Sequence, residues 1–173
     1  IERVPDNLKE VQPTLFFGVP RIWEKFYAGI STKLSQATGI KAKLAAWAQD
    51  VGRRVWTLRN RGASPSGTLA IEYALAKKLI YKKIKPAIGM GRARICVSGA
   101  APIDGKLLEF FTGFDLNILE VYGQSEDCGP TTFNQIGRTR FGSVGPTISG
   151  IEVKIAPDGE ILVRGPNVFK GYY

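Results

Sequence analysis

The sequence predicts an α/β fold, a partial sheet with flanking helices, followed by the beginning of a β subdomain. Helix-forming segments alternate with two short apolar strands, and each strand ends in a loop that contains glycine. From Gly137 onward, glycine-rich turns separate short β-prone segments instead. We therefore expect an α/β segment over residues 1–140 and the start of a β subdomain over residues 141–173.

The first half of the chain is predicted to be mainly helical. Residues 20–61 contain few helix breakers and indicate two helices that meet near Gly39. Residues 61–67 have the composition of a loop, and residues 69–88 predict another helix. A helical wheel gives this last helix an apolar half, with Leu75, Leu79, Ile80, Ile84 and Ala87, and a basic half, with Lys77, Lys78, Lys82 and Lys85. Packing of the apolar half on the core is the simpler interpretation, and contact with an anionic membrane is the alternative.

Two predicted strands lead into two loops. The segment 94–97 is β-prone and runs into the small residues 98–102. A helix over 104–111, with Asp104 as its cap, precedes a second strand over 116–122. Ligands of α/β sheets bind at the carboxyl ends of the strands, so both loops are expected to face a site. A β-hairpin is predicted further on, around a turn at 156–159.

Composition excludes several chemistries. The sequence has no histidine, which excludes a Ser-His-Asp triad and a histidine-ligated metal. Cys96 and Cys128 lie in unlike contexts and do not indicate a disulfide framework. The net charge of +9 favours an anionic partner such as nucleotide phosphate, CoA, nucleic acid or an acidic membrane.

The second loop carries side chains that suit a nucleotide. An aromatic ring at Tyr122 can stack on a purine, the hydroxyl of Ser125 can bond a phosphate oxygen, and the carboxylate of Glu126 can bind Mg²⁺. The first loop has only small side chains, so a flat ligand could approach its backbone. The alternatives are a tight turn at the first loop and a polar surface turn with one core tyrosine at the second.

The second loop also resembles a known motif. Residues 122–126, Tyr-Gly-Gln-Ser-Glu, are similar to the Tyr-Gly-x-Thr/Ser-Glu motif of the adenylate-forming superfamily, which includes acyl-CoA synthetases. Residues 98–102 resemble the adenine-side loop of that family, and residues 159–165 with Gly171-Tyr172 resemble its later glycine-rich signature. Residues 19–25 look like the long-chain fatty acyl-CoA synthetase branch. The four matches occur in the family's order.

The resemblance implies roles for particular residues. Glu126 would bind Mg²⁺ and, with Ser125, would form the catalytic pair, with Ser125 on the phosphate. Trp23 matches a tryptophan proposed to gate the acyl tunnel. Tyr122 would stack on adenine, and the implied nucleotide-binding residues are Gly99, Ala100, Ala101, Pro102, Tyr122, Gly123 and Gln124.

The resemblance implies a ligase that activates a long-chain fatty acid with ATP to an acyl-AMP and transfers the acyl group to CoA. Its cofactors would be ATP or AMP and Mg²⁺, with CoA as co-substrate. The family's phosphate loop and its carboxyl-terminal lysine are missing from these 173 residues, so we expect a central segment that is inactive by itself. The alternatives are a sister ligase for aryl or short-chain acids and a non-catalytic basic module that binds anionic membrane or nucleic acid.

The expected partners of the ligase are fatty acid, ATP and CoA, without nucleic acid. Peripheral contact with an anionic membrane and a homo-oligomer are further interpretations that stay open. The expected location is the cytoplasm, with any membrane contact at the inner face. The sequence contains no run of about eighteen apolar residues, which a membrane-spanning helix would need.

Overall fold

A four-stranded sheet lies at the centre of the computed structural model, which describes residues 3–173. The strand order is β1-β2-β3-β4, in which the first three strands are parallel and β4 is antiparallel to β3. The strands are β1 (Leu15–Gly18), β2 (Ile95–Ser98), β3 (Ile118–Gln124) and β4 (Gly129–Phe133). The carboxyl end of β2 lies beside the middle of β3, with Ser98 paired to Glu120, and β3 continues in the same direction to Gln124.

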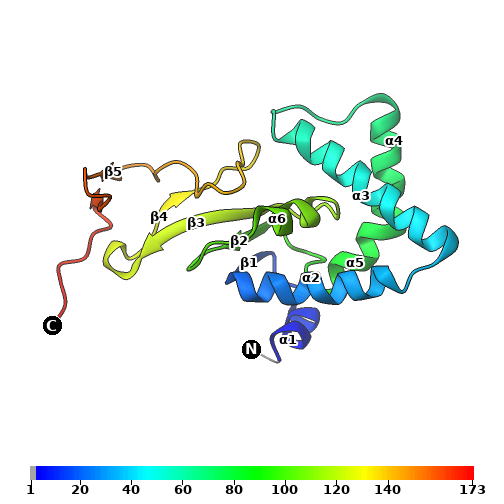
Figure 1. Ribbon diagram of the computed structural model, residues 1–173, viewed down its shortest axis with the longest axis horizontal. Coiled ribbons are helices and arrows are strands. Elements are labelled where there is room, and N and C mark those ends of the chain that lie inside the picture. The colour runs from blue at the N-terminus through cyan, green and yellow to red at the C-terminus, as the bar shows by residue number, and fades with distance from the viewer. Residues whose placement is uncertain (1–2) are drawn as a thin grey trace.

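Helices form most of the rest of the α/β part and gather at one end of an elongated molecule (Figure 1). They are α1 (Val4–Val11), α2 (Pro20–Ser35), α3 (Gly39–Arg59), α4 (Gly67–Ala76), α5 (Lys82–Ala87) and α6 (Gly105–Thr112). Pro20 begins α2 at a position where a missing N–H costs nothing. Asp104 caps α6, because its side chain accepts a hydrogen bond of 2.9 Å from the backbone N–H of Lys106.

The core lies between one face of the sheet and helices α2, α3 and α6. Alternate strand residues, Phe16, Cys96 and Ile118, point into it. From the helices come Trp23 and Phe111, whose rings meet edge to face at 5.7 Å. Burial of such large aromatic side chains supplies much of the stability of a domain of this size.

A π-helical turn, η1 (Lys77–Tyr81), joins α4 to α5 and changes the helix phase. The prediction of one helical run over 69–88 is confirmed in outline, but the prediction that Leu75 and Leu79 face the core is wrong. Both are exposed, whereas Tyr81 is buried and donates a hydrogen bond of 2.6 Å to the carbonyl of Ala48. A helical wheel gives a broad apolar half but does not say which part of it meets the core, and here that part holds Ala76 and Tyr81.

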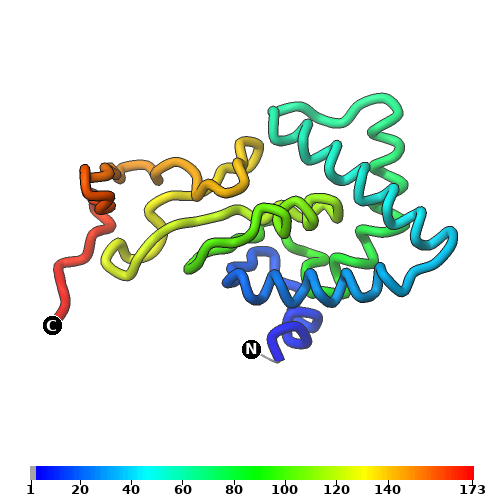
Figure 2. The backbone as a smooth tube through the Cα atoms, viewed as in Figure 1, coloured from blue at the N-terminus to red at the C-terminus, as the bar shows by residue number. Residues whose placement is uncertain are grey.

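The chain after β4 returns toward the helices before it leaves them, as the tube in Figure 2 shows. Asn60 and Thr139 exchange two hydrogen bonds, and Phe141 stacks on Trp56 with ring centroids 4.7 Å apart. The chain then forms an antiparallel hairpin, β5 (Glu152–Ile155) and β6 (Ile161–Arg164), at the far end of the molecule. The hairpin was predicted, and the boundary at residue 140 stays a prediction.

Several elements agree with the sequence analysis and several do not. The break between α2 and α3, the strands β2 and β3 and the helix α6 are confirmed. The sequence analysis did not identify α1, β1 and β4. Among residues 3–173, no helix combines the length and the apolar character that crossing a bilayer requires.

Candidate functional site

The face of the sheet turned away from the core carries a hollow of about 890 Å³. The strand residues that alternate with the core residues line its floor, and the loops at the carboxyl ends of β2 and β3 line one side. Two floor residues of the edge strand, Leu15 and Phe17, are more than half exposed. The lining residues are Leu15, Phe17, Ile95, Val97, Ala100, Leu119, Val121, Gly123, Gln124, Ser125, Gly129, Pro130, Phe133, Asn134, Gln135 and Ile136.

The structure brings four of the predicted site residues to this hollow. Ala100 comes from the loop after β2, and Gly123, Gln124 and Ser125 come from the end of β3. The ladder between β3 and β4 shifts register between Tyr122 and Gly123, and a Cβ at position 123 would collide with the carbonyl oxygen of Gly129. Glycine is therefore required where the loop leaves the strand.

The other predicted nucleotide residues do not line the hollow. Tyr122 is half-buried and belongs to the opposite face of β3 from Val121, because successive strand residues alternate. Gly99 is buried under the hollow's rim, where a Cβ would lie 2.6 Å from Cγ1 of Val121. Ala101 and Pro102 are exposed. Their roles toward a nucleotide stay predictions.

Glu126 lies in the short 3₁₀ helix η2 (Ser125–Asp127), directly beyond the hollow. Its carboxylate accepts a hydrogen bond of 2.7 Å from the hydroxyl of Tyr172, and its carbonyl oxygen accepts one of 2.9 Å from the N–H of Phe169. The hydrogen bond from Tyr172, with one from the backbone, lowers the pKa of Glu126 below its usual value. Glu126 is therefore ionised at neutral pH.

Glu126 offers a single carboxylate, which suits a metal ion whose other ligands are substrate oxygens and water. Within residues 3–173 no cluster of three His, Cys, Asp or Glu side chains could hold a metal. Mg²⁺ in phosphate-transfer sites is commonly held by one or two carboxylates together with substrate phosphates and water. A single ionised glutamate fits that requirement, so Glu126 is compatible with the predicted Mg²⁺ role.

Trp23 occupies the core. It is fully buried, its indole N–H donates a hydrogen bond of 3.2 Å to the carbonyl of Gly18, and it packs edge to face on Phe16 and Phe26. It lies on the helix side of the sheet, away from the hollow. A gating role toward an acyl chain stays a prediction.

Three polar residues that the sequence analysis did not select lie beside the predicted loops. Ser98 and Thr132 are buried, and their hydroxyl oxygens have no hydrogen-bond partner among residues 3–173. Glu120, next to Ser98 in the sheet, is buried, and desolvation raises the pKa of its carboxyl despite a hydrogen bond from the N–H of Gly142. Glu120, a carboxylate inside the predicted strand 116–122, was the one signal in the sequence, whereas Ser98 fell in a predicted loop and Thr132 in a strand that was not predicted.

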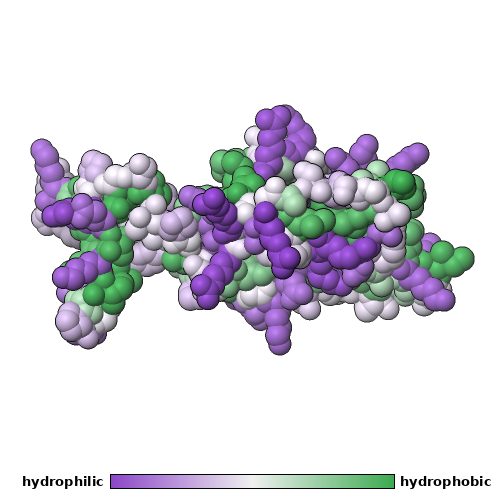
Figure 3. Space-filling model, turned by 90° about the horizontal axis from the view of Figure 1, so that it is seen from above, coloured by the Kyte–Doolittle hydropathy of each residue, from purple (hydrophilic) through white to green (hydrophobic). Residues whose placement is uncertain are grey.

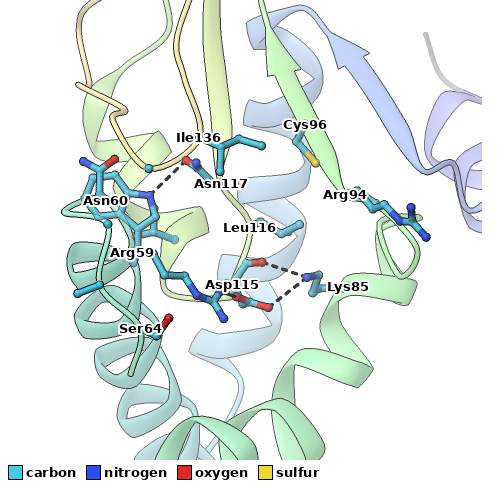
Figure 4. A pocket seen from close by; sticks show the side chains of 17 residues that line it. Arg59, Asn60, Ser64, Lys85, Arg94, Cys96, Asp115, Leu116, Asn117 and Ile136 are labelled. Atoms are coloured by element: carbon cyan, nitrogen blue, oxygen red, sulfur yellow. Dashed lines mark hydrogen bonds and ion pairs between the residues drawn. The ribbon is translucent and has the colours of Figure 1, made fainter. Parts of the chain in front are cut away.

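A second cavity, of about 510 Å³, lies at the amino ends of β2 and β3 (Figure 4). Asp115 lies at its wall and pairs with Arg59 at 3.0 Å and with Lys85 at 3.3 Å. The side chain of Asn117 likewise accepts a hydrogen bond of 3.2 Å from Trp56. Because these polar groups satisfy one another, they join α3 and α5 to the loop between α6 and β3.

The comparisons with known proteins decide the family. A family model described as AMP-binding enzyme matches residues 1–173. The chain belongs to the AMP-binding enzyme family. This confirms the resemblance to adenylate-forming enzymes.

Similar members of the AMP-binding enzyme family include proteins named as fatty-acid–CoA ligases. The chain is 41% identical over 171 residues to the long-chain-fatty-acid–CoA ligase ACSBG2 of Xenopus laevis, covering 96% of this chain and 23% of that protein. It is 36% identical over 173 residues to the long-chain-fatty-acid–CoA ligase FadD15 of Mycobacterium bovis, covering 100% of this chain and 28% of that protein. The chain thus spans about a quarter of the length of these relatives.

A solved structure shows the same fold. The benzoate CoA ligase from Burkholderia xenovorans LB400 superposes with a TM-score of 0.56 at 18% identity, over 99% of this chain and 27% of that one. The α/β fold with a partial sheet and flanking helices is therefore the fold of an AMP-binding enzyme.

Proposed function

We propose that the intact protein containing this chain is an AMP-forming long-chain fatty-acid–CoA ligase. The observation that carries the proposal is the identity of 41% and 36% to two proteins of that name along almost the whole chain. In the first step a carboxylate oxygen of the fatty acid attacks the α-phosphorus of ATP, and pyrophosphate leaves. In the second step the sulfur of CoA attacks the acyl carbonyl carbon, and AMP leaves.

The geometry supports a division of labour among the residues of this chain. The hollow exposes apolar side chains such as Phe17 and Val121 next to the backbone of Gly123 and the hydroxyl of Ser125. An apolar floor beside a few polar groups is the usual composition of a small-molecule site. We propose that Ser125 contacts phosphate and that Gln124 completes the nucleotide wall. Binding of the adenine by Tyr122 and the loop at 99–102 rests on the motif resemblance, because only Ala100 of these residues lines the hollow.

Glu126 is the proposed metal ligand. A bound Mg²⁺ would neutralise phosphate charge during the adenylation step. The lowered pKa of Glu126 keeps its carboxylate available at neutral pH. The hydroxyl of Tyr172 would have to share or release this carboxylate when the ion binds, because both use its oxygen atoms.

The test is Glu126→Ala in the intact protein, assayed by the fatty-acid-dependent exchange of labelled pyrophosphate into ATP. We expect a loss of roughly 100-fold or more, the scale seen when one preorganised electrostatic contact is removed. Glu109→Ala, which removes an exposed carboxylate from α6, is the matched control and should leave exchange unchanged. An unaltered exchange rate in Glu126→Ala, with the fold intact by circular dichroism, would contradict the assignment.

A panel of acids distinguishes the long-chain ligase from a sister enzyme. Pyrophosphate exchange should be fastest with long-chain fatty acids. Faster exchange with benzoate or acetate would favour the aryl or short-chain alternative. Salt-dependent binding to nucleic acid without any exchange would favour the non-catalytic alternative.

Two partners beyond the substrates belong to the same proposal. We propose that the protein contacts an anionic membrane peripherally, at the inner face, because its fatty acid substrate partitions into lipid and the chain carries a net charge of +9. We also propose that the intact protein associates with further copies of itself, and analytical ultracentrifugation of that protein tests this.

A further inference from the structure

An apolar stripe runs along the solvent side of α4 and η1. Ile71, Leu75 and Leu79 are spaced by four residues, and they are exposed by 65%, 48% and 39% of their surface. Residues four apart on a helix lie on one face, and the wider π-turn keeps Leu79 in line with Leu75. The stripe therefore consists of large apolar side chains that no other part of residues 3–173 covers.

Lysines flank the stripe. Lys77, Lys78, Lys82 and Lys83 are exposed, and none of them has an ion-pair partner in the part of the chain that the structure describes. The sequence contains no Asp or Glu between Tyr73 and Ile103. Lys85, by contrast, turns inward to Asp115 and does not belong to this surface.

The opposite side of the same helical run is fixed on the core. Ala76 and Tyr81 are buried, and the hydroxyl of Tyr81 bonds the carbonyl of Ala48 on α3 at 2.6 Å. The helix cannot roll to bury Leu75 and Leu79 without breaking these contacts. The stripe is thus held outward by the fold.

We propose that this surface, the stripe Ile71, Leu75 and Leu79 with its four flanking lysines, is the site at which the protein contacts an anionic lipid membrane. The inference rests on the peripheral membrane contact proposed above and identifies where it occurs. A lipid surface offers acidic headgroups to the lysines and an apolar layer to the leucines, whereas a nucleic acid would use the charges alone. Figure 3 shows apolar patches between hydrophilic side chains at the helical end of the molecule, on the face that it displays.

The experiment is vesicle co-sedimentation of the intact protein. The probes are vesicles of phosphatidylcholine alone and vesicles in which about 30% of the lipid is phosphatidylserine, enough for a strongly negative surface. Two double variants test the apolar and the charged parts of the surface separately. Leu75→Gln with Leu79→Gln removes apolar side chains, and Lys78→Gln with Lys82→Gln removes positive charges. Matched controls change exposed residues elsewhere: Ile155→Gln on β5, and Lys41→Gln with Lys43→Gln on α3.

We expect the wild type and both controls to bind the anionic vesicles and not the neutral ones. Each double variant should weaken the partition coefficient roughly tenfold or more, since each lysine near the surface and each inserted leucine contributes to binding. Binding that survives either double variant, or equal binding to neutral vesicles, would overturn the surface assignment. Absence of wild-type binding would overturn it together with the proposed membrane contact.

Ligase activity separates this inference from the proposed reaction. The double variants should retain wild-type pyrophosphate exchange with fatty acid supplied without vesicles, because none of the changed residues lines the hollow. A wild type that binds anionic vesicles but shows no exchange would refute the ligase and leave the membrane surface in place.

Discussion

The hydroxyl of Tyr172 donates a hydrogen bond of 2.7 Å to Oε1 of Glu126, although the two residues lie 46 positions apart. The ring of Tyr172 packs edge to face on Phe169, whose N–H bonds the carbonyl of Glu126. The glycine-rich end of the chain therefore touches the loop that carries the proposed metal ligand. Two separate sequence motifs meet at one carboxylate.

Tyr172→Phe should raise the pKa of Glu126 toward the ordinary value of a glutamate. The hydrogen bond from Tyr172 is the main cause of the lowered pKa, so its removal takes away the preference for the ionised form. A lowered pKa contributes stability that is present above the pKa of the unfolded chain and is lost as pH falls through the folded-state pKa. The stability difference between the wild type and Tyr172→Phe should therefore shrink on acidification.

The measurement is an NMR titration of the side-chain carboxyl carbon of Glu126, with urea unfolding at several pH values alongside it. Tyr173→Phe is the matched control, since that ring is fully exposed at the next position. A Glu126 titration that stays the same in Tyr172→Phe would show that the hydrogen bond is not formed in solution.

Ala100→Gly should stabilise the fold, by roughly 0.5 kcal/mol. Ala100 has a φ of +67°, where a side chain costs roughly 1–2 kcal/mol, whereas glycine loses only about 0.4–1 kcal/mol through greater freedom in the unfolded chain. Ala101 has no positive φ, so Ala101→Gly should instead destabilise by a few tenths of a kcal/mol to about 1 kcal/mol. Urea unfolding measures both variants. A higher free energy of unfolding for Ala100→Gly together with a lower one for Ala101→Gly would confirm the strained conformation at Ala100. An equal decrease in both variants would argue against it.

Trp23→Ala should lower the free energy of unfolding by about 3–5 kcal/mol, because it empties a fully buried site among three aromatic rings. Urea unfolding measures this loss. The gating role is tested by Trp23→Phe in the intact protein, which should alter the dependence of pyrophosphate exchange on acyl chain length.

Phe26→Leu is the control for the gating test, since Phe26 is buried against Trp23 with ring centroids 5.9 Å apart. Its substitution should lower stability without changing the chain-length profile. The same profile for the wild type, Trp23→Phe and Phe26→Leu would assign Trp23 to the core alone.

Much of the helical part could be predicted because its signals are local. Gly39 separates α2 from α3, and Asp104 precedes α6 as a cap, in both the sequence analysis and the structure. The strands β1 and β4 were missed for a physical reason. Leu15–Gly18 lies between Pro13 and Pro20, and Gly129–Phe133 begins with Gly-Pro, and these residues indicate turns locally.

The candidate site shows the same division. The motif residues at 98–102 and 122–126 were identifiable from their chemistry and order, but strand alternation and a register shift decide that Ser125 and Gly123 line the hollow while Tyr122 does not. The buried Ser98 and Glu120 became visible only once β2 and β3 were paired. The sequence could not show that Ser98 and Glu120 are buried, because the residues that cover them come from other elements of the fold.

By itself, the sequence determined the family, the alternation of helices and strands, and the loops that carry the nucleotide motifs, because these depend on residue types at short spacing. The tertiary structure alone decided that Leu75 and Leu79 face solvent, that Trp23 lies in the core, and that Tyr172 reaches Glu126. Each of these outcomes depends on contacts between segments distant in the chain, such as that of Tyr81 with Ala48, and such contacts leave no periodic signal in the sequence.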